Sequence, residues 1–548
     1  MTHRNTHQTQ GEELHFDVLI VGAGPSGLAA AIHLAQADPS RSIALLDKGR
    51  HPGAHILSGA IMDPKGMNLL LPGWQQEVPW PVIPVTEERF VFLTPEKTCP
   101  LPHFNLFGHG GCCLVSLGKL CRWLSQRAEA LGVHVFFGFC AQEPIWDTQG
   151  ILRGVVTGDR GRNRDCQPMT HFQPGVRLLA PITLIAEGAR GHLASILIQR
   201  LRLDQGQTPQ HYALGLKEVW EIPAATSRPG TIGHAVGWPL GRGCHGGGFA
   251  YHSETGRIDL GLVVDLDYPD PRTDPFALLQ CLKTHPWLRS LLARGRPLEA
   301  GARVLVKGGV QSLPNPAFPG GFLIGDAAGF LDGTRMKGIH QAILSGVAAA
   351  TTILELGKTP PQDLAWGRRY RQSLHSLVLP DLIRGRNVQP GMAMGLWPGM
   401  LHGFIDQSLF RGHAPWTLRR HRPDRAPGRH TTSPAPSLSC HGPMVIDRDR
   451  TLFLAGVRYR ENQPPHVRIQ RPATPQPSSN QTEVQTVDHP EHHYCPAGVF
   501  SSSSGPTSRI PLRSHRCLHC QTCSIKDPDT AIFWQPPEGG DGPHYQTL

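Results

Sequence analysis

A glycine-rich turn near the start of the chain restricts its fold more than any other feature. Residues 16–21 form an apolar, β-branched run that predicts a strand, and 28–36 has the composition of a helix. Between them, Gly22, Gly24 and Gly27 permit a tight bend, a close backbone approach to a pyrophosphate and close helix–strand packing. The helix N-terminus then faces the phosphates. We therefore expect a Rossmann-like βαβ unit in an α/β fold.

The alternation of helices and strands continues downstream. Helical periodicity predicts a helix over 117–131, and apolar runs predict strands over 133–137 and 178–186. Segments rich in Pro, Ser, Thr, His and Arg at 423–443 and 471–493, and the serine run at 501–504, predict loops.

A second strand supports a dinucleotide rather than an empty turn. Residues 41–47 are apolar and end at Asp47, twenty residues beyond Gly27. This spacing is typical of an acid that accepts a hydrogen bond from a ribose hydroxyl. A glycine turn without a ligand is the simpler alternative. FAD and NAD share the fingerprint, so it does not choose between them.

A downstream motif favours FAD. The segment 320–329 again resembles a strand that ends in a glycine and a carboxylate, Gly325 and Asp326, and Gly338 precedes an apolar helix over 339–350. A carboxylate there suits ribityl hydroxyls, and a helix start can stabilise negative charge on a reduced flavin ring. Residues 185–189 resemble a third element of such flavin folds. The alternative for Asp326 is an ordinary turn aspartate.

The cysteine pattern near the end of the chain predicts a metal centre. Cys517, Cys520 and Cys523 have the spacing Cys-x2-Cys-x2-Cys, and Cys495 is followed by proline upstream. Asp527 stands where a bacterial ferredoxin has a further cysteine for a second cluster. We expect these four cysteines to hold one [4Fe-4S] cluster, because zinc usually takes two separated cysteine pairs. Zinc and unliganded thiols are the alternatives.

Composition limits the compartment and the partners. The chain has 548 residues, a mean hydropathy of -0.24 and a net charge of +10, which permits an anionic lipid surface. Residues 1–13 are polar and lack a signal-peptide core, so the 13 cysteines indicate reduced thiols in an intracellular protein. We expect the nine cysteines outside the cluster set to be core or surface thiols, and we expect no nucleic-acid partner.

With a flavin fold in front and a cluster behind, the chain resembles the electron-transfer flavoprotein:ubiquinone oxidoreductase family over nearly its whole length. The stretches that carry the resemblance include 53–60, 127–133, 215–220, 236–240, 308–314, 415–418, 495–499 and 537–540. The resemblance implies a monotopic membrane enzyme that takes electrons from reduced electron-transfer flavoprotein and passes them through FAD and a [4Fe-4S] cluster to ubiquinone. It also implies that Gly246 and Gly247 line the quinone headgroup site.

The resemblance further implies a division into three parts. The first is an FAD-binding domain over 1–390, interleaved with quinone-binding segments at about 66–110 and 205–310. A membrane-contact segment with a basic loop over 391–430 follows, and 431–548 is a ferredoxin-like cluster domain. We expect the protein at the cytoplasmic face of a bacterial inner membrane, or at the mitochondrial inner membrane if the source is eukaryotic.

Two segments depart from the family pattern. Residues 108–113 read Gly-His-Gly-Gly-Cys-Cys where the family has Asn-His-Gly-Asn-Tyr, and His245 replaces a usual tyrosine. These changes bear on flavin potential and quinone geometry. They motivate one alternative, a degenerate membrane-bound paralogue without activity. The other is a flavin-dependent reductase of isoprenoid double bonds of the geranylgeranyl type, which shares the front half of the fold.

Two apolar segments are candidates for membrane contact. Residues 391–410 carry Met, Leu, Trp and Phe side chains with a single acid, Asp406, but Pro398 prevents a spanning helix. Six arginines follow between Arg411 and Arg429, an arrangement suited to insertion beside anionic headgroups. Residues 67–85 are the second candidate. The alternative is that both segments are ordinary buried chain.

Overall fold

A computed structural model describes most of the chain. The described residues are 12–102, 108–241, 243–357, 364–420, 424, 440–470, 490–501, 511–527 and 529–548. The loops predicted within 423–443 and 471–493 and the serine run at 501–504 lie largely outside these ranges, as do Arg422, Arg425 and Arg429 of the basic loop.

The front of the chain builds a mostly parallel sheet. Its strand order is β21 (Ala317–Phe318), β22 (Gly321–Leu323), β15 (Ile182–Ile185), β2 (Val18–Val21), β3 (Ile43–Asp47) and β9 (His134–Phe137). Its central strands are apolar and fully buried, as expected for a parallel sheet covered on both faces. The predicted strands at 16–21, 41–47 and 133–137 are confirmed.

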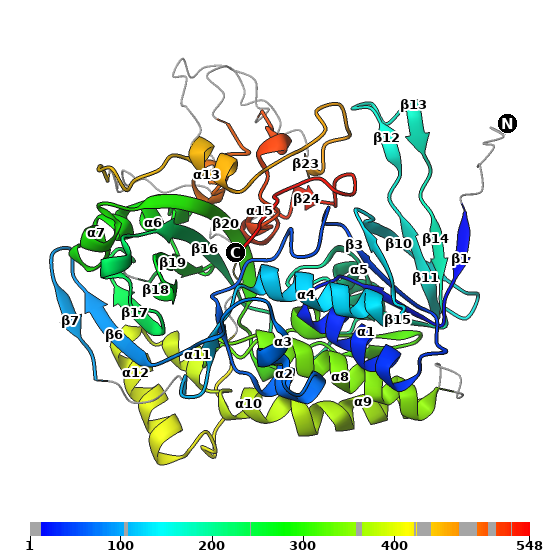
Figure 1. Cartoon of the computed structure of the whole chain (residues 1–548), viewed down its shortest axis with the longest axis horizontal. Helices are drawn as coiled ribbons and strands as arrows, with labels where there is room; N and C mark the ends of the chain where they lie inside the picture. Colours follow the sequence, from blue (N-terminus) through cyan, green and yellow to red (C-terminus); the bar gives the residue numbers. More distant parts are fainter. Residues whose placement is uncertain are drawn as a thin grey trace, which may run out of the picture.

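Helices and a smaller sheet cover this parallel sheet (Figure 1). The helices are α1 (Pro25–Ala37), α2 (Lys65–Leu70), α3 (Trp74–Glu77), α4 (Leu117–Ala130), α5 (His192–Leu201), α8 (Ile339–Leu356), α9 (Leu364–Leu377) and α10 (Leu379–Arg384). The smaller sheet has the order β1 (Glu13–His15), β14 (Arg177–Leu179), β11 (Leu152–Thr157) and β10 (Ala141–Trp146), and the hairpin β12 (Arg160–Arg162) and β13 (Pro168–Gln173) extends beside it.

One helix in the described part of the chain, α8, is long and apolar enough to cross a membrane. It packs against α1, and 72% of its apolar window is buried. That burial is what a core helix requires.

A second, larger sheet gathers strands from two distant parts of the chain. Its order is β20 (Arg296–Val306), β16 (Tyr212–Glu221), β19 (Arg257–Asp265), β18 (Gly246–Glu254), β17 (Thr231–Gly237), β6 (Glu87–Leu93) and β7 (Thr98–Pro100). Helices α6 (Pro275–Thr284) and α7 (Pro286–Leu292) pack on it. The small sheet has the order β4 (Ile61–Met62), β8 (Cys113–Leu114) and β5 (Ile83–Pro84), and its Ile61 and Leu114 share a buried cluster with Ile232 and Phe249 of the larger sheet.

The C-terminal segment shares its core with the larger sheet. It contains α13 (Arg448–Leu454), α14 (Glu491–Tyr494), α15 (Thr522–Lys526) and the strand pair β23 (Val467–Ile469) and β24 (Ile532–Trp534). Leu214 and Val304 of the sheet belong to the same buried cluster as Cys517, Tyr545 and Leu548. The segment, red in Figure 1, therefore packs as part of one folded body.

The structure corrects two predictions about elements. The strand expected over 178–186 is two strands, β14 and β15, in different sheets, because Pro181 between them cannot donate a ladder hydrogen bond. In the second candidate for membrane contact, residues 67–85, the apolar side chains of Met67, Leu70 and Trp74 are buried in the core, whereas Leu69 is 49% exposed.

A disulfide corrects a third prediction. Cys281 of α6 is bonded to Cys440, with their Cα atoms 5.2 Å apart. We expected all cysteines to be reduced, and the two are 159 residues apart in the sequence. Only the fold brings them together, so their spacing carried no signal.

Candidate functional site

The glycine turn after β2 leaves space in front of a helix. Gly22 has φ of +112°, and a Cβ there would lie 2.4 Å from the Ala186 carbonyl oxygen. A Cβ on Gly27 would lie 2.0 Å from the Gly22 carbonyl oxygen, whereas one on Gly24 would meet nothing within 4 Å. Gly24 is the N-cap of α1 and borders a cavity. The turn is thus compact on its inner side and open where a pyrophosphate would approach the helix N-terminus, which fits a dinucleotide.

Asp47 closes this turn with its carboxylate. Oδ2 accepts a hydrogen bond from the Ala23 backbone N–H at 2.8 Å, and Oδ1 accepts one from the Gly49 N–H at 2.6 Å. Asp47 also lines the cavity. Because a carboxylate has about four acceptor positions, it can still accept a hydrogen bond from a ribose hydroxyl.

The downstream motif meets the same cavity from the other side. Gly325 has φ of +61° and donates its N–H to Ser345 Oγ at 2.8 Å, and it is followed by Asp326 at the end of β22. Burial raises the pKa of Asp326 to about 6, and the nearby Arg303 guanidinium opposes that rise. Gly338 is the N-cap of α8. Asp326 and Gly338 line the cavity, whereas Gly325 and Gly27 shape its walls from behind.

This cavity is large and continuous. It has a volume of about 450 Å³, and its lining includes Gly24 of the glycine turn and Met392 and Leu396 of the segment 391–410. Gly246 and Gly247 of β18 also line it. The residues expected to bind FAD and those expected to bind quinone therefore face one space.

The two glycines of β18 are needed by the sheet itself. Gly246 has φ of +138°, and a Cβ there would lie 2.0 Å from the Val263 carbonyl oxygen. On Gly247 it would lie 2.6 Å from the Ala235 carbonyl oxygen. Side chains at either position would push neighbouring strands apart, so the cavity wall here is bare backbone that a flat ring can approach.

His245 precedes these glycines and also lines the cavity. Its Nδ1 lies 3.8 Å from Asp267 Oδ2, and Arg420 forms an ion pair with the same carboxylate. Arg420 belongs to the predicted basic loop. Because its side chain is occupied inside the protein, it is not one of the arginines that could face lipid headgroups.

The four predicted cluster cysteines come together in the C-terminal segment, and all are buried. Three of their sulfur atoms accept hydrogen bonds at 3.4 Å, from the Val499 N–H, the His519 N–H and the Thr522 hydroxyl. Burial raises the pKa of Cys517 to about 12 and that of Cys520 to about 11. Buried thiolates at this density need a cation to balance them.

The spacing of these sulfur atoms argues against zinc. Among the described residues, the groups of three or more ligand atoms within 4.8 Å of one another are Glu88–His109–His234 and His211–Asp265–Asp267, and the four cysteines form no such group. Four thiolates around one zinc ion would lie about 3.8 Å apart, given a Zn–S bond of about 2.3 Å. Any three of these sulfur atoms therefore include a pair more than 4.8 Å apart, which fits a cube with one iron at each thiolate.

Arg303 connects the two sites and was missed by the sequence analysis. It lies on β20, lines the cavity, and its Nη1 donates a hydrogen bond to the His519 carbonyl oxygen at 3.4 Å. His519 lies between two cluster cysteines. The one sequence signal was a charged residue within the otherwise apolar run 300–306, which indicates a functional or paired position.

Family models match three parts of the chain. Residues 20–73 match the NAD(P)-binding Rossmann-like domain, 212–305 match the ETF-QO ubiquinone-binding domain, and 442–546 match the 4Fe-4S domain of electron transfer flavoprotein-ubiquinone oxidoreductase.

Curated relatives match over nearly the whole chain. The probable electron transfer flavoprotein-ubiquinone oxidoreductase of Acinetobacter baylyi is 39% identical, covering 98% of this chain and 99% of the relative. The Pseudomonas aeruginosa protein of that name is 38% identical, with 98% and 100% coverage. The mitochondrial protein of Sus scrofa is 38% identical, with 97% and 89% coverage.

A solved structure shares the front fold. A geranylgeranyl bacteriochlorophyll reductase-like protein from Thermoplasma acidophilum superposes with a TM-score of 0.56 and 16% identity, covering 74% of this chain and 93% of its own. At this identity the similarity concerns the fold alone.

Proposed function

Because the chain belongs to the electron transfer flavoprotein-ubiquinone oxidoreductase family, we propose that its large cavity holds FAD at the glycine turn and the quinone headgroup beside Gly246 and Gly247. The protein is an oxidoreductase that passes electrons from reduced electron-transfer flavoprotein through FAD and a [4Fe-4S] cluster to ubiquinone. The isoprenoid-reductase alternative has only the shared fold in its favour.

The continuity of the cavity is the observation that carries the assignment of residues. The same space is lined by Gly24 and Asp326 of the nucleotide site and by Gly247 of the large sheet, and Gln521 borders it from the cluster loop. Electron transfer needs the cofactors and the substrate to be close, and the protein contributes their positions and their electrostatic surroundings.

Each group of residues has a distinct task in this proposal. Gly22, Gly24 and Gly27 with the α1 N-terminus bind the pyrophosphate, and Asp47 binds the ribose. Asp326 and Gly338 position the flavin end, with Gly325 behind them. Cys495, Cys517, Cys520 and Cys523 hold the cluster. When bound, FAD and the cluster supply the redox chemistry, while these residues bind, orient and shield them.

Helix α12 (Leu396–Phe404) has two apolar faces, which support a membrane contact for this membrane-associated enzyme. Leu396, Gly399, Met400 and Gly403, spaced as one face of a helix, line the cavity. Trp397 and Leu401 face outward and are 55% and 62% exposed. An apolar outer face on a helix whose inner face lines an apolar cavity suits a helix lying in the lipid interface. We therefore assign the mouth of the cavity, through which quinone enters, to α12. In Figure 1, α12 lies at the lower left, away from the C-terminal segment.

We further propose that this contact is with the cytoplasmic face of a bacterial inner membrane. The matches to the Acinetobacter and Pseudomonas relatives cover 98% of this chain and 99% and 100% of the relatives, which supports a bacterial setting. The division into an FAD domain over 1–390, a membrane-contact segment over 391–430 and a cluster domain over 431–548 remains our proposal as well.

The test uses the purified holoenzyme in detergent, reduced electron-transfer flavoprotein and a short-chain ubiquinone. Quinol formation by protein that contains FAD and four irons is expected. Met400→Trp would fill the cavity mouth and is expected to raise KM for quinone about tenfold or more, because tight cavities do not accept extra volume. Met394→Trp in the same segment, where the side chain is 52% exposed and does not line the cavity, is the matched control. Equal KM values for both variants would contradict the assigned mouth.

A further inference from the structure

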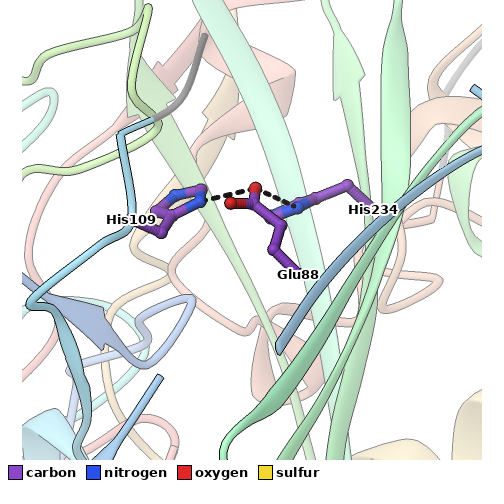
Figure 2. Close-up of side chains that lie close together, drawn as sticks. All are labelled: Glu88, His109 and His234. Atoms are coloured by element: carbon purple, nitrogen blue, oxygen red, sulfur yellow. Dashed lines mark hydrogen bonds and ion pairs between the residues drawn. The ribbon is translucent and has the colours of Figure 1, made fainter. Parts of the chain in front are cut away.

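A buried polar cluster lies on the large sheet beside the cavity, outside the FAD and cluster sites. It contains Glu88 of β6, His109 of the segment before β8, His234 of β17 and Tyr251 of β18. Figure 2 shows that both imidazoles turn toward the same carboxylate, from opposite sides. The preceding sections give these residues no role in holding either cofactor.

The distances form an unbroken chain of polar contacts. Glu88 Oε1 lies 2.7 Å from His109 Nδ1 and 3.5 Å from His234 Nδ1. The opposite ring nitrogen, His234 Nε2, lies 2.8 Å from the Tyr251 hydroxyl. The carboxylate thus connects two imidazoles, and the second imidazole connects the carboxylate to a phenol.

Burying these polar side chains costs free energy unless they form hydrogen bonds with one another. The side chains of His109, His234 and Glu88 are 1%, 5% and 9% exposed, and apolar neighbours such as Ile232 and Phe249 surround the cluster. Burial lowers the pKa of His109, and the Glu88 carboxylate opposes that change. Polar networks of this kind in a low-dielectric interior are stable only when their members satisfy one another.

The cluster reaches from the cavity toward the surface. His234 and Tyr251 line the cavity, and Tyr251 lies on the same face of β18 as Gly247, because side chains alternate along a strand. At the other end, His109 is followed by Gly110 and Gly111, which are both exposed. The polar contacts therefore bridge the cavity wall and a solvent-exposed loop.

Quinone reduction requires protons at the cavity as well as electrons. Ubiquinone takes two electrons and two protons to become ubiquinol, and the electrons arrive from the cofactors. An apolar cavity that excludes water needs a path for protons. Burial raises the pKa of Tyr251, so its hydroxyl stays protonated and must be reprotonated as it donates.

Resting on the proposed function, we propose that Tyr251, His234, Glu88 and His109 form a proton relay to the bound quinone. The Tyr251 hydroxyl donates its proton to one quinone oxygen and takes the proton on His234 Nε2. His234 is recharged at Nδ1 through Glu88, and His109 returns a proton from water to Glu88. The relay delivers one proton and, after His109 has recharged it from water outside the cavity, delivers the second. Tyr251 is the catalytic residue, and Glu88 and His109 are positioning residues.

A divalent metal ion is the competing occupant of this cluster. Glu88, His109 and His234 each offer a ligand atom within 4.8 Å of the others. However, the 2.7 Å separation of Glu88 and His109 is a hydrogen-bond length, and His234 already engages Tyr251 through its other nitrogen. These contacts favour the relay, and metal content is an outcome of the test.

The experiment compares Tyr251→Phe and Glu88→Gln with the parent holoenzyme. Three quantities are measured: binding of a short-chain ubiquinone to the oxidised protein, reduction of the enzyme by reduced electron-transfer flavoprotein, and kcat for quinol formation in H2O and D2O. We expect quinone affinity and enzyme reduction within about twofold of the parent. We expect kcat to fall about 100-fold, as for loss of a general acid, with a larger solvent isotope effect.

His252→Gln is the matched control. His252 lies next to Tyr251 on the opposite face of β18, and its Nδ1 accepts a hydrogen bond from the Arg228 N–H. This variant is expected to keep the parent kcat and isotope effect. A kcat within twofold of the parent in both Tyr251→Phe and Glu88→Gln would overturn the relay. Failure of the parent itself to bind and reduce quinone would instead overturn the proposed function.

Two further measurements keep the inference falsifiable if kcat changes for structural reasons. In a His234→Ala variant that retains FAD, added imidazole is expected to raise kcat at least tenfold. A misfolded site would not allow this rescue. Metal analysis of the parent should find no stoichiometric divalent metal beyond the cluster iron. A bound metal that disappears in Glu88→Gln would assign the cluster to metal binding and overturn the relay.

Discussion

Gly22 and Gly24 lie two residues apart, yet the structure predicts that a methyl group at Gly22 affects folding and one at Gly24 affects FAD binding. A methyl group on Gly22 meets the Ala186 carbonyl oxygen at 2.4 Å in a left-handed backbone conformation, whereas one on Gly24 meets no protein atom within 4 Å. We expect Gly22→Ala to destabilise the apoprotein by roughly 1–3 kcal/mol. Gly24→Ala should change the stability of the apoprotein by less than about 1 kcal/mol. It should lower FAD affinity tenfold or more, since the methyl group occupies the space for phosphate. Thermal unfolding and flavin-fluorescence titration measure the two effects, and equal FAD affinity in Gly24→Ala and the parent would refute the phosphate site.

Cys520 tests the ligand set. Cys520→Ala removes one thiolate and is expected to abolish the electron paramagnetic resonance signal of the reduced cluster and to lower iron content, with FAD retained. Cys121→Ala, which changes an equally buried thiol in α4, should leave the signal unchanged. An unaltered signal in Cys520→Ala would remove Cys520 from the ligand set.

Local patterns predicted the cofactor residues, but not the residues that join them. The glycine turn and the cysteine triplet each act within a few residues of the sequence, and Asp47 follows the turn at a characteristic distance, so spacing alone indicates their chemistry. Arg303 and His519, or Glu88 and His234, are more than a hundred residues apart and meet through sheet pairing and packing. Without the register of the sheets, the sequence offers no means to pair them.

At the scale of elements, α12 exposes an apolar outer face whose contact with water is unfavourable. Trp397→Ser combined with Leu401→Ser is expected to weaken binding to vesicles that contain anionic lipid at least tenfold, because burial of each such side chain contributes about 1.5–3 kcal/mol. Phe453→Ser on α13, where the side chain is 83% exposed, is the control and should bind as the parent does. Flotation of the protein with vesicles measures the difference. Undiminished flotation of the double variant would contradict the assigned membrane face.

Elements with strong periodicity were predicted well, and their limits were set by proline and by tertiary burial. The helices expected over 28–36, 117–131 and 339–350 are α1, α4 and α8. Pro181 divided the strand expected over 178–186, and packing inside the fold buried Met67, Leu70 and Trp74 of the apolar segment 67–85. An apolar sequence predicts that its side chains avoid water, but burial in the protein core and insertion into lipid both remove them from water.

At the scale of the whole molecule, residues 546–547 form hydrogen bonds both with the large sheet and with the start of α4. The buried Glu299 carboxylate of β20 accepts hydrogen bonds from the Gln546 and Thr547 backbone N–H groups at 2.6 and 2.9 Å. Glu299→Ala leaves both donors unpaired and is expected to lower the free energy of unfolding by about 2–4 kcal/mol. Glu221→Ala, at the exposed end of β16 in the same sheet, should cost under about 1 kcal/mol. Denaturant titration measures the free energy of unfolding of the two variants. Similar decreases in both would show that the hydrogen bonds to Glu299 contribute little to stability.

The contact between Ser116 and Thr547 has a consequence for biosynthesis. The Ser116 hydroxyl at the start of α4 donates to the Thr547 carbonyl oxygen across 431 positions of sequence. A ribosome must therefore release residue 547 before α4 gains this contact. Such long-range closure slows folding and leaves incomplete intermediates exposed to aggregation. Cellular maturation would accordingly depend on protection of the nascent chain until that residue has emerged.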